Sequence, residues 1–160
     1  MKEIIFSIIG AFVVLYIVMK FFSRRYIWSR LLSLILAVAS PVLVMKDSIF
    51  AFTNNYKGDY EYDIKMWIIF SAVQLLSALL WEAPTLFDEY EITGKYETPI
   101  DDDDAPWTPQ VGGGFFWNTV VVIIVVAINT AISAANGFPF ILSSLLIYGN
   151  VRDIIWWVRQ

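Results

Sequence analysis

The chain has 160 residues, a formal net charge of −4, 58% hydrophobic residues and only 16% charged residues. A soluble domain has about a quarter charged residues, so this composition excludes an ordinary soluble protein and predicts an integral membrane protein. The sequence contains no cysteine and no histidine. Disulfides and catalysis by cysteine or histidine are therefore excluded, and the usual ligands of haem, iron–sulfur and most transition-metal cofactors are missing.

Five apolar runs predict transmembrane helices, at about 4–22, 27–45, 66–81, 115–135 and 139–158. The clearest run is 115–135, whose uncharged residues would form about 31 Å of helix, enough for the roughly 30 Å hydrocarbon core of a bilayer. The first run could also be a signal peptide. Because it is long and is followed by Arg24 and Arg25 instead of a small-residue cleavage site, we expect a retained span.

The last run, 139–158, leaves two interpretations open. Asn136-Gly137 predicts a tight turn before it, and Pro139 suits the first turn of a new helix. Polar residues then interrupt the run, so it is either a fifth span or a re-entrant helix followed by an interfacial one. We favour the fifth span. The predicted fold is an all-α integral membrane protein, a single-domain bundle of four to five transmembrane helices with one long acidic loop at 82–114.

The distribution of Lys and Arg predicts the orientation in the membrane. With the N-terminus outside, seven basic residues lie on the inner side and four on the outer side, and Arg24, Arg25 and Arg30 contribute most of this difference. We therefore expect the C-terminus and the acidic loop in the cytoplasm. The short basic turns are typical of proteins of the bacterial inner (plasma) membrane.

Two runs have small residues at four-residue spacing, which places them on one helix face and allows close backbone approach. These residues are Ser29, Ser33 and Ala37 in the second run, and Ala127, Ala131 and Ala135 in the fourth. One interpretation is packing within the chain, and the other is docking of a partner protein's helix.

Polar residues inside the runs need hydrogen-bond partners in hydrocarbon. Gln74 and Asn129 both fall near mid-membrane, so we predict a hydrogen bond between them. Together with Asn118 in the fourth run, these residues either hold helices together or line a permeation path.

Charged residues fall inside three of the runs, with Lys20 near the end of the first run, where it can extend to the interface. Arg152 and Asp153 are neighbours in the last run, and since adjacent helix positions do not face each other, we predict no pair between them. Arg152 is expected at the interface, where long side chains extend toward water, and Arg30 is expected to reach the headgroups in the same way. A location within the membrane would make Asp153 the one candidate for a proton or cation site.

The acidic loop contains four consecutive carboxylates, Asp101, Asp102, Asp103 and Asp104. We expect a solvated acidic segment, with a hard-cation site or docking on a basic partner surface as alternatives. Trp107 lies between two prolines and could anchor such docking or enter the membrane interface.

These features predict a non-catalytic subunit or accessory (scaffold) protein of a larger membrane complex, because no catalytic constellation is present. The expected partners are the lipid bilayer and other membrane proteins, with no cofactor and no nucleic acid, since the sequence lacks a basic patch interleaved with aromatic residues. One alternative is a small homo-oligomeric channel, holin-like or transport component. A further alternative is an immunity-type membrane protein.

Overall fold

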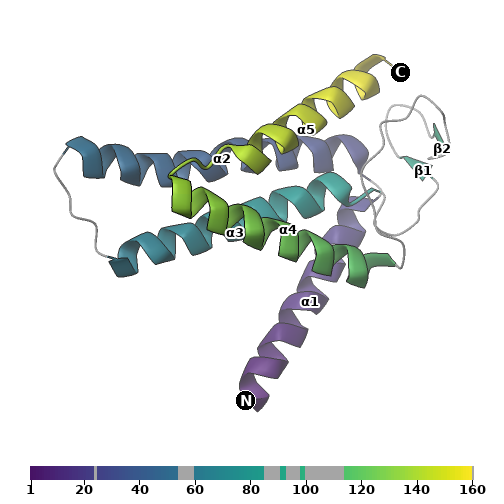
Figure 1. Ribbon diagram of the computed structural model, residues 1–160. Helices are drawn as coiled ribbons and strands as arrows, with labels where there is room; N and C mark the ends of the chain where they lie inside the picture. The colour runs from purple at the N-terminus through teal and green to yellow at the C-terminus, as the bar shows by residue number, and fades with distance from the viewer. Residues whose placement is uncertain (24, 54–59, 85–90, 93–97, 100–113, 160) are drawn as a thin grey trace.

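The computed structural model describes residues 1–23, 25–53, 60–84, 91–92, 98–99 and 114–159, with side chains over 1–23, 25–44, 64–84 and 114–159. Five helices make up most of this part of the chain (Figure 1). They are α1 (Lys2–Ser23), α2 (Tyr26–Thr53), α3 (Tyr60–Glu82), α4 (Gly114–Asn136) and α5 (Ile141–Arg159). Two short strands, β1 (Glu91–Ile92) and β2 (Thr98–Pro99), pair antiparallel in the segment between α3 and α4.

The all-helical prediction is confirmed for the five runs. Helices α1 to α4 are each long and apolar enough to cross a membrane. Helix α5 is not among these four, because Asn150, Arg152 and Asp153 lower its hydropathy. Its buried face consists of Ser143, Leu146, Gly149, Asn150 and Asp153 and therefore includes three of its polar residues. The opposite face is exposed and mainly apolar, with Ile141, Leu145, Tyr148, Val151, Ile155 and Val158 beside Ser144.

Helices α2, α3, α4 and α5 lie side by side in Figure 1, and α1 projects away from them. Helix α2 packs mainly against α3 and α5, while α4 packs mainly on α3. The start of α2, the end of α3, the start of α4 and the end of α5 lie at the same end of the bundle (Figure 1). Side chains from all four helices therefore meet there.

The interior of the bundle is unusually polar. Buried serines, amides and charged groups are interspersed with buried apolar residues such as Phe70, Leu79 and Leu146. Large apolar side chains instead cover the outside of every helix. This distribution suits a bilayer, where lipid covers the apolar exterior and interhelical hydrogen bonds connect the helices.

A glycine ends α4 and sets the direction of α5. Gly137 has φ +65°, and the N–H of Phe138 donates to the carbonyl of Ser133 at 3.2 Å. This is the left-handed helix cap in which glycine is preferred. The predicted turn at this position is confirmed, although α5 begins at Ile141, after Pro139.

Replacing Gly137 with alanine tests this cap. A Cβ there would meet no atom within 4 Å, so the only cost is the left-handed backbone, about 1 kcal/mol. We expect a lower melting temperature for the purified chain in detergent, measured by circular dichroism. Gly10→Ala is the control, because Gly10 also has open space around it but lies inside α1. Equal melting of Gly137→Ala and the parent protein would contradict the cap.

Candidate functional site

A buried ion pair joins α2 to α5 at the end of the bundle where α3 ends. The Arg30 Nε donates to Asp153 Oδ2 at 2.8 Å, and both side chains have no exposed area. Charges are buried at a high desolvation cost unless they are paired and fully hydrogen-bonded. The surroundings of this pair therefore matter as much as the pair itself.

Asp153 accepts hydrogen bonds from three side chains. Besides Arg30, the Trp81 indole Nε1 donates to Oδ2 at 2.9 Å. The Arg152 Nε donates to Oδ1 at 2.8 Å, and the Arg152 Nη2 lies 2.7 Å from the same oxygen. We call Arg30, Trp81, Arg152 and Asp153 the charge cluster. It connects α2, α3 and α5 through one carboxylate.

Two further contacts position Arg30. Its Nη1 donates to the backbone carbonyl of Trp81, one of the carbonyls that the end of α3 leaves without a partner in the helix. Its guanidinium carbon lies 4.5 Å from the centre of the Tyr26 ring, a cation–π distance. The Tyr26 ring in turn contacts the Trp156 ring edge-to-face, with 5.5 Å between the ring centres.

Gly149 makes room for Trp81 to reach Asp153. A Cβ on Gly149 would lie 2.5 Å from Trp81 Cζ2 and 2.8 Å from Trp81 Cε2, so the indole lies directly on the α5 backbone. Gly149 and Asp153 are four residues apart and share a helix face. The absence of a side chain at one position therefore allows the hydrogen bond at the other.

Hydrogen bonds continue from the charge cluster along the interior of the bundle. Ser33 and Ser77 exchange hydroxyl-to-carbonyl bonds across α2 and α3, at 2.7 and 2.8 Å. The Asn150 Nδ2 donates to Ser33 Oγ at 2.8 Å. This group fixes α2, α3 and α5 one to two turns below the ion pair.

A second group of hydrogen bonds lies farther along the same helices. Asn129 Nδ2 donates to Gln74 Oε1 at 2.7 Å, and Gln74 Nε2 donates to Ser143 Oγ at 2.7 Å. The hydroxyls of Ser143 and Ser40 lie 3.3 Å apart. The predicted bond between Gln74 and Asn129 is therefore present. We call both groups together the polar seam, which consists of Ser33, Ser40, Gln74, Ser77, Asn129, Ser143 and Asn150.

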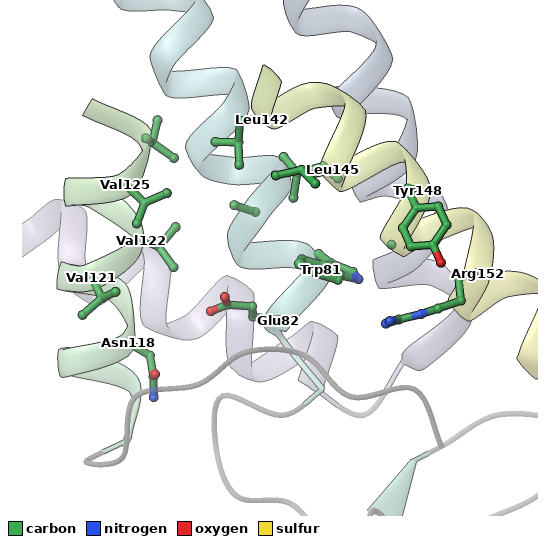
Figure 2. A pocket seen from close by; sticks show the side chains of 14 residues that line it. Trp81, Glu82, Asn118, Val121, Val122, Val125, Leu142, Leu145, Tyr148 and Arg152 are labelled. Atoms are coloured by element: carbon green, nitrogen blue, oxygen red, sulfur yellow. The ribbon is translucent and has the colours of Figure 1, made fainter. Parts of the chain in front are cut away.

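An apolar groove of about 500 Å³ lies beside the charge cluster, between α4 and α5, with α3 behind it (Figure 2). Its walls are branched aliphatic side chains, Val121, Val122, Val125, Leu142 and Leu145. One end of the groove is polar and is formed by Glu82, Asn118 and Arg152 (Figure 2). Trp81 and Arg152 belong to both the charge cluster and the groove, so the two features are adjacent.

Two predictions about charged residues are wrong. Arg152 and Asp153 do contact each other, because the long Arg152 side chain bends back to the neighbouring carboxylate. Arg30 is not at the headgroups but fully buried, since Asp153 and the Trp81 carbonyl offer it better partners inside the bundle. The sequence contained a signal for this pair, an Arg and an Asp each within an apolar run, but it did not show that α2 and α5 are neighbours.

The two small-residue faces have different surroundings. Ser29, Ser33 and Ala37 are all fully buried against neighbouring helices, as packing within the chain requires. Ala127, Ala131 and Ala135, the alanine stripe, are exposed. Helix α4 instead buries the face of Asn118, Thr119, Val122, Val126, Asn129 and Ser133. Polar residues, not small ones, determine which side of α4 faces the bundle.

The remaining candidate residues have local roles or lie outside the described residues. Asn118 Nδ2 donates to the carbonyl of Gly114 at 2.8 Å within α4. Asp101 to Asp104 and Trp107 lie outside the described residues. Within the part of the chain that the structure describes, no three acidic side chains gather as a metal site would need.

No protein-family model, curated protein or solved structure matches this chain. The function is therefore argued from the charge cluster, the polar seam, the groove and the exposed helix faces.

A double-mutant cycle tests the buried ion pair. Arg30→Met and Asp153→Asn each leave one partner unsatisfied, so each should destabilise the fold by about 3 kcal/mol. The double variant should lose less than the sum, with a coupling of about 1 to 3 kcal/mol. The measurement is unfolding of the purified protein in mixed detergent micelles.

Arg159→Ala is the control for this cycle, because Arg159 is exposed at the end of α5. It should leave the unfolding free energy unchanged. Strictly additive losses in the Arg30 and Asp153 variants would show that the two side chains do not interact in the folded protein.

Proposed function

We propose that this protein is a non-catalytic accessory subunit of a larger membrane protein complex. The observation that carries the proposal is the position of α1. Only Met19 and Ser23 of this helix are buried, and its side chains are exposed on all sides from Ile4 to Ala11. Contacts with the bundle begin at Phe12, whose ring centre lies 6.0 Å from that of Phe116. The first part of α1 is therefore available to another membrane protein.

Small residues on α1 support docking of a partner helix. Ser7, Gly10 and Ala11 form a small patch on the exposed part of the helix. A Cβ on Gly10 would meet no atom of this chain within 4 Å, so the fold itself does not require glycine there. Transmembrane helices associate through such patches, because small side chains let two backbones approach closely. The outward-facing alanine stripe of α4 offers a second surface of the same kind.

The polar seam weighs against the channel hypothesis. Gln74 and Asn129 are buried and bonded to each other, so their amides serve helix packing and not a water-filled path. No observation specifically favours an immunity-type protein.

We further propose that α5 is a fifth span and that the charge cluster lies at the cytoplasmic side of a bacterial inner membrane. The outward face of α5 is mainly apolar and Ser143, Asn150 and Asp153 point inward, which suits contact with lipid. Arg25, Arg30, Arg152 and Arg159 belong to the end of the bundle where α2 starts and α5 ends (Figure 1). An excess of basic residues favours the cytoplasmic side, which supports an N-terminus on the outside.

Purification from native membranes in mild detergent tests the subunit proposal. We expect the tagged protein to elute with other membrane proteins in a fixed ratio, determined by mass. Gly10→Leu should reduce that ratio at least tenfold, because about 1.4 kcal/mol of lost helix packing is enough for this change. Ala131→Leu tests the alanine stripe in the same way.

Ile5→Leu and Ile132→Leu are the matched controls, since both residues are exposed on the same two helices, lie away from the small-residue faces and are already large. They should leave the complex intact. Elution of the parent protein as a single chain, with no difference among these variants, would overturn the proposal.

A further inference from the structure

The groove between α4 and α5 has the shape and lining of a site for an acyl chain. Its volume of about 500 Å³ falls within the range of about 300 to 1,000 Å³ for small-molecule sites. Val121, Val122, Val125, Leu142 and Leu145 give it hydrocarbon walls (Figure 2). Within a bilayer, the molecules in contact with such a surface are lipids.

The polar end of the groove lies at the depth of lipid headgroups. Glu82 is the last residue of α3, and Asn118 lies within the first turns of α4. Helix ends of this length reach the interface of a bilayer. From there the groove extends along α4 and α5 toward the middle of the bundle, as the positions of Val125 and Leu142 in Figure 2 show.

Two side chains, one acidic and one basic, define what the polar end can bind. Glu82 on α3 and Arg152 on α5 both line it, and in Figure 2 the Arg152 guanidinium points toward Trp81 while the Glu82 carboxyl points toward α4. The Arg152 side chain is 40% exposed although Asp153 holds part of it. A guanidinium binds phosphate oxygens through charge-assisted hydrogen bonds, and a carboxylate accepts them from an ammonium group.

We propose that this groove binds one phospholipid whose headgroup carries both a phosphate and a primary ammonium, as in phosphatidylethanolamine. Arg152 contacts the phosphate, Glu82 accepts hydrogen bonds from the ammonium, and an acyl chain lies along Val122, Val125 and Leu145. The site is separate from the α1 surface and does not depend on the subunit proposal. The charge cluster contributes by fixing Arg152, through Asp153, at the mouth of the groove.

The test is native mass spectrometry of the purified protein titrated with phosphatidylethanolamine, phosphatidylcholine or phosphatidylglycerol of the same acyl chains. We expect one phosphatidylethanolamine per chain, bound about tenfold more tightly than the other two lipids. Phosphatidylcholine lacks ammonium N–H groups, and phosphatidylglycerol lacks the positive charge. Glu82→Gln should remove the preference over phosphatidylglycerol while binding of a lipid persists.

Val125→Trp tests the acyl-chain part of the site, and Ile128→Trp is its matched control. Both residues are exposed on α4, so neither change disturbs the core, but only Val125 lines the groove. We expect Val125→Trp to weaken lipid binding at least tenfold and Ile128→Trp to leave it unchanged. Equal binding of the three lipids, or equal binding by the two Trp variants, would overturn the proposal. The proposal would also be overturned if no lipid is bound and Val125→Trp instead displaces a second copy of the chain or a partner helix from the groove.

Discussion

The Asp153 carboxylate determines how the central helices of this protein meet. It is fully buried on α5 and accepts hydrogen bonds from Arg30 on α2, Trp81 on α3 and Arg152 beside it. A buried carboxylate in an apolar setting is tolerated only when its oxygens are satisfied, so the three helices must converge at this point. The Trp81 indole that donates to this carboxylate requires a glycine at position 149 of α5, since any side chain there would displace the indole. Because it also holds Arg152, the same carboxylate shapes the polar end of the groove.

In the rest of the bundle, buried polar groups must also find hydrogen-bond partners, but these groups are uncharged and cost less to bury. Four of the protein's helices are long and apolar enough to cross a membrane, and in hydrocarbon the attraction between such helices comes from hydrogen bonds and close packing. The polar seam provides these bonds between α2, α3, α4 and α5, through Ser33, Gln74 and their partners. Helix α1 takes little part in this network and stays outside the bundle. The helix that contributes no residue to the polar seam is thus the one that we assign to a partner protein.

The sequence predicted where the helices lie along the chain, but not which helices pack against each other. Long apolar runs identify α1 to α4 directly, because a bilayer requires about twenty apolar residues per helix. Two polar residues at equal depth also predicted the Gln74–Asn129 bond. The Arg30–Asp153 pair could not be predicted, since the residues are separated by 123 positions and span length carries no information on which helices touch. The alanine spacing in α4 suggested packing within the chain as one interpretation, yet buried polar residues turn that face outward.

Cysteine cross-linking tests the central claim, that polar contacts hold α5 against α2 inside the membrane. The chain has no cysteine, and the Ser40 and Ser143 hydroxyls lie 3.3 Å apart, so Ser40→Cys with Ser143→Cys brings two thiols within bonding geometry. Mild oxidation of isolated membranes should convert this pair to a disulfide, measured by mass as the loss of both free thiols. Val38→Cys with Ser144→Cys, two exposed positions on the same helices, should stay reduced. If both pairs remain free thiols, α5 does not pack on α2 and the account is contradicted.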